Sequence, residues 1–584
     1  MSDIVATIQA EQDEIIRSPH RGLVVVQGGP GTGKTAVALH RVAYLLYAQR
    51  ERLERSGVLL VGPSRIFLRY IEAVLPSLGE TGVVSRTMGS LVPGVSATAV
   101  EDPALARLKG LPAWAGILRE AVRRLARLPE RDQELRVWNR RVVLRRSDVD
   151  RARRHAKRSG RPHNVAREGF ARELMDVLAV RLAKEAGGAD WEGRVGKDEK
   201  SAWLAEIRDS VDARRAINLA WMPTSATTLL GRLYARPEVL AEANRRAGSP
   251  LRPDELRALA RPRCRAWTVS DVALIDELEE LLGPMPDPGA ARARQDGAAD
   301  VARAQAAIES QGLGGGIVTA QMLAESASPQ EEWAPLAERA ANDRTWAYGH
   351  VVVDEAQELT AMEWRALLRR CPSRSFTVVG DLDQARGARR PGSWEKALGP
   401  AARALEKEYV LTVSYRTPRA LTELAQAVVA RAGSPVMYPM RAVRDVPDCY
   451  SVERVDATGA SEGPLPPRER DPLWGVSQGA VRRAASRLDA SDGPGAGRIA
   501  VIVGARRARA WGADADGDSA LQDRVGVLSA GAAKGLEFDS VVLVEPCEIL
   551  ADGVGDLFVA LTRATHDVRV VHSRPLPAGM EEWA

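Results

Sequence analysis

The sequence is poor in the residues on which many secreted, metal-binding and membrane proteins depend. Its 584 residues include only 4 cysteines and 7 histidines, which form no C-x-x-C pair and no spacing typical of metal ligands. No apolar run approaches the roughly 18 residues that a membrane-spanning helix needs. The opening stretch MSDIVATIQAEQDEIIR carries acidic side chains and no apolar core with a cleavage site, so no signal peptide is predicted. We therefore expect a cytoplasmic protein with reduced thiols.

Aromatic residues are also scarce, at 5% of the chain, which leaves little material for a track of stacked bases. Hydrophobic residues make up 45% and charged residues 27%, as in ordinary globular proteins, and the length indicates several domains. The formal net charge is +5, and the positive charge is concentrated. Residues 119–184 hold 20 Lys and Arg against 9 Asp and Glu. The excess of positive charge in this segment favours a polyanionic partner. Separately, we expect the protein to be a monomer.

The pattern of apolar residues changes twice along the chain. Residues 1–110 alternate short β-branched runs such as GLVVVQG with helical stretches, which is typical of an α/β domain with a parallel sheet. Residues 111–342 are basic and mainly helical in pattern, and the α/β alternation returns from residue 343. We therefore predict that residues 1–110 and 343–404 form one α/β domain, that residues 111–342 are inserted into it, and that residues 405–584 form a second.

A glycine-rich stretch after the first apolar run carries the clearest chemical signal. The sequence GGPGTGKT fits the pattern G-x-x-x-x-G-K-[ST], between a strand pattern and a helix pattern. Backbone N–H groups of such a loop surround a β-phosphate, the lysine reaches the β- and γ-phosphates, and the hydroxyl binds Mg²⁺. The predicted nucleotide-binding residues are Gly28, Gly29, Pro30, Gly31, Thr32, Gly33, Lys34 and Thr35.

Two later strand ends supply the groups that hydrolysis of a nucleoside triphosphate requires. The stretch HVVVDEAQ ends in Asp354, the predicted magnesium ligand, and Glu355, the predicted general base. The stretch FTVVGDLDQ ends in Gln384, whose carboxamide is suited to sense the γ-phosphate or to position water.

These pieces, in this order, resemble the UvrD-like class of superfamily 1 helicases. Gln12 in IQAEQDEII matches the adenine-reading glutamine of the class, while DEAQ and GDLDQ resemble its second and third motifs. SYRTP, AAKGLEFD and VALTRAT resemble its next three motifs. The resemblance implies two RecA-like parallel-sheet motor domains, the first interrupted by a large insertion, with ATP and Mg²⁺ as ligands and GTP left open. It also implies roles for four residues: Tyr415 stacking on adenine, Arg416 at the γ-phosphate, Glu537 near the ribose and Arg563 as a second arginine finger.

Other features depart from a DNA-translocating helicase. No aromatic residue follows Gln384 before Trp394, and Gly531 stands where the class carries a histidine. DIVATIQAEQDEIIR, GPSRIFLRYIEAVLPSLGE and RTWAYGHVVVDEAQELTAMEWRALL are similar to the HelD family of the actinobacterial type, helicase-like NTPases that bind bacterial RNA polymerase and clear it from nucleic acid. The N-terminal helical arm of that family has no counterpart before Gln12, so we expect either that Met1 is not the true start or that this is a form without the arm.

The sequence leaves three functions open. The first is an ATPase that binds RNA polymerase and remodels or releases it from nucleic acid. The second is a 3′–5′ helicase or translocase on single-stranded DNA, and the third is a nucleotide-gated clamp with slow hydrolysis. For the basic insertion, a solvated face, a polymerase contact and direct binding of DNA or RNA all remain possible interpretations. Its aromatic residues Trp203, Trp221, Tyr234 and Trp267 are expected in its core rather than as stacking platforms.

Overall fold

The structure is a computed structural model that describes residues 11–74, 82–188, 190, 192, 194–262, 266–286, 306, 336–386, 390–456, 465–513 and 523–583. It divides into two compact units. One unit joins Met1–Glu101 to Leu336–Ala584, and the other comprises Asp102–Pro335. Within the described residues, no helix is long and apolar enough to cross a membrane.

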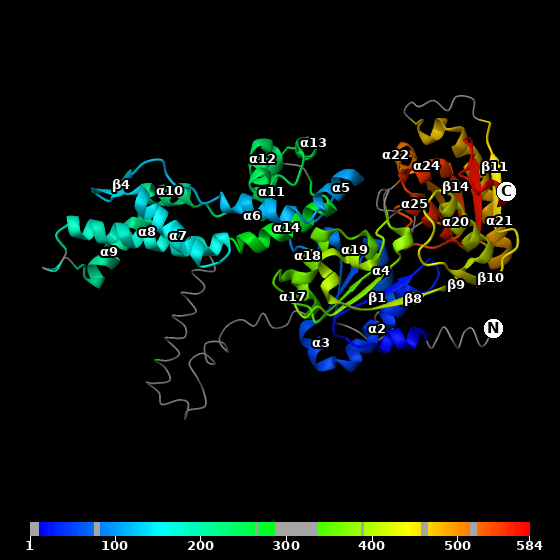
Figure 1. The fold of residues 1–584 in the computed structure, drawn as a ribbon, viewed down its shortest axis with the longest axis horizontal. Helices are drawn as coiled ribbons and strands as arrows, with labels where there is room; N and C mark the ends of the chain where they lie inside the picture. The colour runs from blue at the N-terminus through cyan, green and yellow to red at the C-terminus, as the bar shows by residue number, and fades with distance from the viewer. Residues whose placement is uncertain are drawn as a thin grey trace. The chain divides into compact units, whose positions relative to one another are not determined.

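The first sheet of the larger unit is built from both of its chain segments. Six strands lie in the order β3-β2-β6-β7-β1-β8, and all neighbours are parallel. Their bounds are β1 Leu23–Gly28, β2 Val58–Gly62, β3 Val83–Thr87, β6 His350–Val353, β7 Phe376–Gly380 and β8 Leu405–Leu411. The associated helices are α2 Lys34–Ala48, α3 Arg50–Ser56, α4 Arg65–Val74, α17 Leu336–Asn342, α18 Ala361–Arg370 and α19 Trp394–Leu398 (Figure 1). Strands β1, β2, β6 and β7 are buried along their whole length, as expected for parallel strands covered on both faces.

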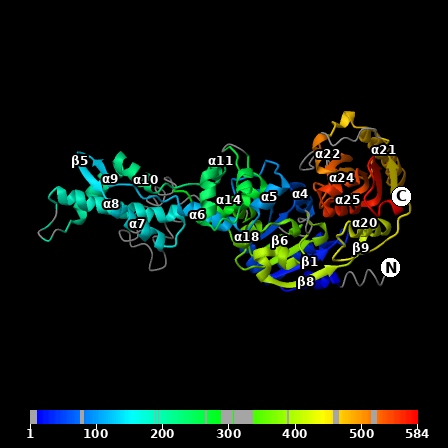
Figure 2. The ribbon, with the colours of Figure 1, turned by 45° about the horizontal axis from the view of Figure 1, so that its top comes forward.

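The second sheet is parallel as well. Its strand order is β11-β15-β14-β12-β13, and a separate parallel pair joins β9 to β10. The strands are β9 Val413–Pro418, β10 Arg441–Arg444, β11 Tyr450–Arg454, β12 Ile499–Val503, β13 Val525–Ser529, β14 Phe538–Val544 and β15 Ala564–His572. The helices are α20 Arg419–Arg431, α21 Pro472–Asp492, α22 Ala505–Ala510, α24 Pro546–Asp552 and α25 Val554–Thr562 (Figure 2).

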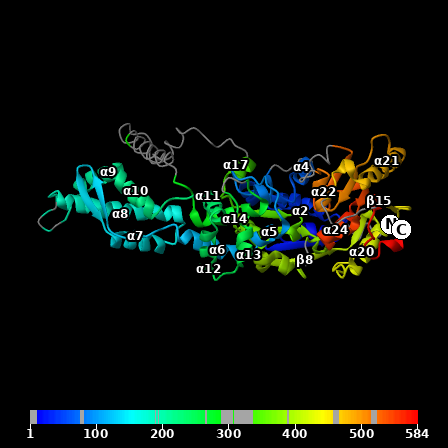
Figure 3. The ribbon, with the colours of Figure 1, turned by 90° about the horizontal axis from the view of Figure 1, so that it is seen from above.

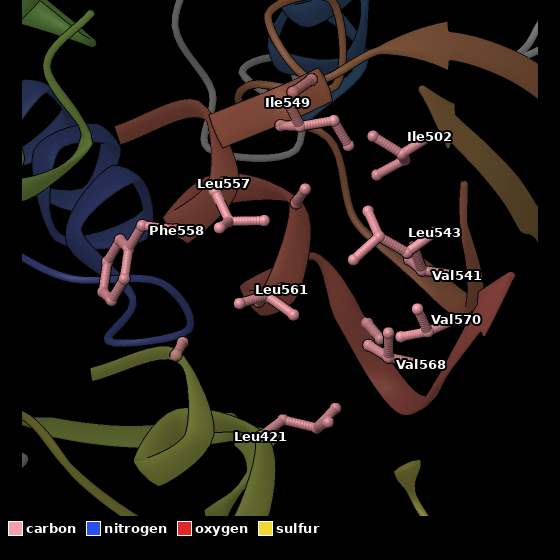
Figure 4. Close-up of a cluster of buried hydrophobic side chains, with 14 of the residues drawn as sticks. Leu421, Ile502, Val541, Leu543, Ile549, Leu557, Phe558, Leu561, Val568 and Val570 are labelled. Atoms are coloured by element: carbon pink, nitrogen blue, oxygen red, sulfur yellow. The ribbon is translucent and has the colours of Figure 1, made fainter. Parts of the chain in front are cut away.

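Apolar side chains from α20, α24 and α25 cover one face of this second sheet. Leu421, Leu557 and Leu561 approach Leu543 and Val568 of the strands in one buried cluster (Figure 4). The opposite face packs against α21 and α22 through a second cluster. A parallel sheet with helices on both faces is the α/β architecture that the sequence predicts. The fold class is confirmed: there are two RecA-like sheets, and a mainly helical unit interrupts the first.

The smaller unit consists mostly of helices around a core of its own. Helices α7 to α10 lie side by side in Figure 3, and their inward faces share one buried cluster. The elements are α5 Pro103–Lys109, α6 Trp114–Arg123, β4 Gln133–Val137, β5 Arg140–Leu144, α7 Arg146–Arg158, α8 His163–Glu185, α9 Lys197–Asp209, α10 Val211–Ala220, α11 Ala226–Ala235, α12 Pro237–Arg246, α13 Pro253–Ala258 and α14 Val269–Leu282. Trp203, Trp221 and Tyr234 are buried, which confirms that they belong to the core. Trp267 is half-buried.

Several boundaries differ from the ones that the apolar pattern suggests. The smaller unit begins at Asp102 rather than at residue 111, and α17 packs on β3 in the larger unit, although the pattern assigns residues 336–342 to the insertion. Strand β8 pairs with β1, so the first sheet extends to Leu411 and past the expected boundary at residue 405. The antiparallel hairpin β4–β5 has no counterpart in the sequence prediction. A hydrophobic pattern identifies a strand, but it does not say which sheet the strand joins.

Candidate nucleotide site

The glycine-rich loop connects β1 to α2 in the manner that the motif predicts. Strand β1 ends at Gly28, and α2 begins at Lys34 with Gly33 as its N-terminal cap. Gly31 and Gly33 have φ angles of 70° and 80°, in the left-handed region that glycine adopts without steric cost. The turn therefore directs the first backbone N–H groups of α2 toward the loop, where they can hold a phosphate.

Thr35, at the start of α2, meets the end of strand β6. The Thr35 hydroxyl donates a hydrogen bond of 2.9 Å to Oδ2 of Asp354. Octahedral Mg²⁺ holds oxygen ligands about 2.0–2.1 Å away, which places adjacent ligand oxygens about 2.9 Å apart. The hydroxyl and the carboxylate oxygen thus have the chemistry and the spacing that suit a magnesium ion.

Glu355 has the most constrained environment at this strand end. Its backbone lies in the left-handed region with φ 50°, which is uncommon for a residue other than glycine. Its N–H donates to Asp354 Oδ1 at 2.7 Å, and its Oε2 accepts a 2.6 Å hydrogen bond from Gln357 Nε2. Backbone strain held in place by such contacts is common at functional sites.

The two carboxyl groups have opposite pKa shifts. Burial, followed by the neighbouring charge of Glu355, raises the pKa of Asp354 to about 6. Burial also opposes ionisation of Glu355, but the positive charges of Lys34, Arg563 and Lys534 outweigh it and hold the pKa of Glu355 below its usual range. An ionised buried glutamate beside the phosphate loop is suited to accept a proton from water.

A chain of amide and carboxylate contacts joins the base of the loop to the turn after β7. Gln27 Nε2 donates to Asp381 Oδ1 at 2.8 Å, and Gln384 Nε2 donates to Asp381 Oδ2 at 2.7 Å. On its other side, Gln384 Oε1 accepts a hydrogen bond of 2.5 Å from Arg563 at the end of α25. Gln384 therefore connects the first α/β domain to Arg563 of the second.

Strand β9 of the second α/β segment lies against the phosphate loop. The Tyr415 N–H donates to the Gly31 carbonyl at 3.2 Å. A Cβ atom added at Gly33 would collide with the Tyr415 hydroxyl and would lie 3.6 Å from Gln12 Nε2. The side chains of Gln12 and Tyr415 thus converge on Gly33, although 403 positions separate Gln12 from Tyr415 in the sequence. Arg416 forms an ion pair with the Glu537 carboxylate, so these two predicted site residues meet as well.

The structure adds residues that the motif analysis did not single out. Lys534 is almost completely buried, and its Nζ donates 2.6 Å hydrogen bonds to Glu358 Oε1 and to the Gln384 carbonyl. Arg386 donates to the carbonyl of Gly531 at 2.7 Å, at the position where the helicase class carries a histidine. Lys534 is the lysine of the motif AAKGLEFD, and its place inside this motif is the sequence signal that could have identified it. The partners of both residues are too far away along the chain to be read from the sequence.

Together these contacts define an α/β protein of the P-loop type, in which the first α/β domain carries the phosphate loop and the second contributes Arg416 and Arg563. Residues 8–62 match the UvrD-helicase family, described as the UvrD/REP helicase N-terminal domain. The segment that carries the phosphate loop is therefore UvrD-like.

Similarity to solved structures is limited. The crystal structure of Arterivirus nonstructural protein 10 (helicase) matches with a TM-score of 0.21 and 16% identity over 40% of this chain and 41% of that chain. The complex of the same Arterivirus helicase with DNA gives a TM-score of 0.22 and 17% identity over the same shares. The chain thus spans about two fifths of the length of these helicases, and no curated protein matches it significantly.

Proposed function

We propose that the chain is an ATP-hydrolysing, Mg²⁺-dependent motor of the UvrD-like helicase type. The observation that carries this proposal is the hydrogen bond from Arg563, at the end of α25 in the second α/β domain, to Gln384. Gln384 in turn donates to Asp381, whose carboxylate accepts from Gln27 just before the loop. A nucleotide held by the loop would lie between groups of both α/β domains. Binding would then draw the domains together, and hydrolysis would release them.

The motif resemblance proposes a role for each residue, and the contacts described above support these roles. Lys34 would neutralise the β- and γ-phosphates, Thr35 and Asp354 would hold Mg²⁺, and Glu355 would remove a proton from the attacking water. Gln384 positions that water, while Arg416 and Arg563 stabilise the charge that develops on the γ-phosphate. Gln12 and Tyr415 contact the base and Glu537 the ribose. Gln12 supports ATP over GTP through the resemblance alone.

We further propose bacterial RNA polymerase as the partner that the motor remodels or releases from nucleic acid. Two observations support RNA polymerase as the partner over translocation along DNA. The insertion lies within the first sheet domain, as in the HelD-like resemblance. Trp394, the first aromatic residue after Gln384, is fully buried and donates to Gln27 Oε1 at 3.1 Å, so it offers no free face for a base.

A single-stranded DNA translocase is the second candidate function, and a slow nucleotide-gated clamp is the third. The basic insertion is compatible with all three. Its arginines are less available than the sequence suggests, because Arg123, Arg124, Arg153 and Arg154 pair with nearby glutamates or aspartates. Such exposed ion pairs are weak, and a phosphate could replace the carboxylates.

The test is the steady-state ATPase rate of the chain alone, with single-stranded DNA, and with core RNA polymerase, each over a salt series. We expect stimulation by the polymerase and co-elution with it. Stimulation by DNA alone would establish the translocase, and slow, unstimulated turnover with nucleotide-dependent polymerase binding would establish the clamp. Lys34→Ala is the control for all arms, because loss of its charge should abolish hydrolysis; turnover retained in this variant would contradict the phosphate-loop assignment.

A further inference from the structure

The hairpin β4–β5 belongs to the smaller unit, where β4 packs against α10 and β5 against α8 (Figures 1 and 2). Its strands are antiparallel, and Val137 pairs with Arg140, so residues 138–139 form a two-residue turn. Every second side chain points into the core of the unit, and these inward residues are Leu135, Val137, Val142 and Leu144, all 5% exposed or less. The hairpin is therefore a fixed platform with one outward face.

The first residue of the turn is unusual in two independent respects. Trp138 has a φ angle of 51°, in the left-handed region that disfavours a bulky side chain, and two-residue hairpin turns normally place Asn, Asp or Gly there. The residue is nevertheless 68% exposed. Neither backbone preference nor burial explains a tryptophan at this position. A strained and exposed aromatic residue is a candidate contact residue.

The outward face beside this tryptophan carries two positive charges, Arg136 and Arg141, and one negative charge, Glu134. Arg136 and Arg141 are directly paired across the two strands, and like charges in such positions destabilise a hairpin. Arg141 donates to Glu134 Oε1 at 3.0 Å. Among the described residues, the Arg136 guanidinium has no hydrogen-bond partner, whereas its backbone groups bond to Asp212 and Ser210. A bound anion would relieve the repulsion between the two guanidinium groups.

We propose that this hairpin binds single-stranded nucleic acid, with a base stacked on Trp138 and the adjoining phosphate held by Arg136 and Arg141. An exposed aromatic residue two positions after Arg136, which has Arg141 opposite it, fits a nucleotide, because each nucleotide joins an aromatic ring to a phosphate. Two residues of a strand span roughly 6.8 Å, which keeps that phosphate within reach of Arg136. A duplex buries the faces of its bases, so an unpaired strand is the matching partner. This site goes beyond the proposed function and does not depend on the nucleotide site.

The test measures fluorescence anisotropy of a labelled 20-nucleotide oligo(dT) and oligo(U), titrated with the full chain without ATP. We expect Trp138→Ala to weaken binding about tenfold, and Trp138→Phe to retain most of the affinity, since stacking survives. In Arg136→Gln/Arg141→Gln, the slope of log affinity against log salt should fall by roughly 0.7 for each phosphate that the variant no longer neutralises. Tyr47→Ala, which removes an 83% exposed aromatic residue from α2, is the matched control and should bind like the unaltered chain.

A structural role for Trp138 is distinguished by thermal unfolding. Trp138→Gly relieves the left-handed strain, so we expect an unchanged or higher unfolding temperature together with weaker binding. Loss of binding in step with loss of stability would overturn the proposal. Unchanged affinity in Trp138→Ala, or failure of the chain to bind either oligonucleotide, would also overturn it. Equally tight binding of polyglutamate, unaffected by Trp138→Ala, would overturn it too, because it would indicate an acidic protein surface as the partner. None of these results depends on ATP hydrolysis, so failure of this proposal and of the ATPase proposal are distinguishable.

Discussion

His350 lies at the start of β6 in a hydrogen-bonded chain that fixes its protonation. Arg41 Nε donates to Thr377 Oγ1 at 2.9 Å, which leaves the threonine hydroxyl to donate to His350 Nε2 at 2.9 Å. His350 Nδ1–H then donates to Ser375 Oγ at 2.8 Å, because that hydroxyl donates to the His20 carbonyl. Arg41 also donates to the carbonyls of residues 15, 16, 18 and 19, which follow Gln12. A neutral imidazole is thus part of the structure that holds the Gln12 segment.

This histidine predicts an acid-sensitive stability. Burial, with the nearby charge of Arg41, lowers the pKa of His350 to about 3. Below pH 6.5 this histidine binds a proton in the unfolded chain but not in the folded chain. The free energy of unfolding should therefore fall by about 1 kcal/mol per pH unit as pH decreases from 6.5. Urea unfolding between pH 7.5 and 5 measures this, and His350→Gln should flatten the dependence. His155→Gln, at an exposed histidine, should leave the pH dependence of stability unchanged. Equal pH profiles in the unaltered chain and both variants would contradict the role of His350.

Gly33 predicts a second effect at the scale of one residue. In Gly33→Ala the added methyl group meets the Tyr415 hydroxyl at a φ of 80°, so we expect loss of measurable nucleotide binding. Gly187→Ala is a matched control, since Gly187 has a φ of 82° and nothing within 4 Å of the added atom. Both variants carry the backbone cost of about 1 kcal/mol, and only the first obstructs the site. Titration with a fluorescent ATP analogue separates them, and equal affinities would show that the contact with Tyr415 is unimportant.

At the scale of elements, one turn couples the two sheets. Asp383, in the short helix after β7, accepts hydrogen bonds from Arg390 at 2.6 Å and from the N–H groups of Met437 and Tyr438 at 2.9 and 3.1 Å. These partners precede and follow β8, so the carboxylate ties the turn that contains Gln384 to the loop between α20 and β10. We therefore expect Asp383 to couple the position of this loop to Gln384 at the candidate site.

We expect Asp383→Ala to lower the ATPase turnover number at least tenfold while the KM for ATP changes much less, because coupling between elements is commonly 1–3 kcal/mol. Steady-state kinetics measure both constants. Glu395→Ala, at an exposed acid of α19, is the control and should match the unaltered chain. A parallel loss of binding and turnover would indicate that Asp383 supports the fold rather than the coupling.

The sequence predicts elements better than it predicts their partners. The runs LVVVQG, HVVV and FTVVG are predictable as buried strands because parallel strands are apolar on both faces. The hairpin Gln133–Leu144 escaped prediction because its strands are only five residues long and lie in an arginine-rich segment whose overall pattern is helical. Gln27 and Asp381 meet across 354 positions, and Arg563 and Gln384 across 179. Such contacts depend on how the strands are ordered, which no local pattern encodes.

For the whole molecule, the division into two units predicts that the larger one is independent of the smaller. Arg86 of β3 donates to the Ala341 carbonyl at 3.2 Å, so α17, with which the chain re-enters the larger unit, lies beside β3, the last strand before the chain leaves it. Replacement of residues 102–335 by a short Gly/Ser linker should therefore preserve folding and keep the dissociation constant for ATP within about threefold. Calorimetric titration with the nucleotide checks this. Oligonucleotide binding should disappear in the same protein, and its persistence would place that activity in the larger unit.

The strand order of the first sheet also has a consequence for synthesis of the chain. Strand β1 leaves the ribosome before both of its neighbours, β7 and β8, which come after the smaller unit, and β8 ends at Leu411. At roughly 5–20 residues per second, β1 waits about 20–80 seconds for its last partner. The smaller unit, whose core contacts are internal, can fold in that interval. The nascent phosphate-loop segment is therefore a natural client for a ribosome-associated chaperone, and rare codons before residue 411 would lengthen its exposure.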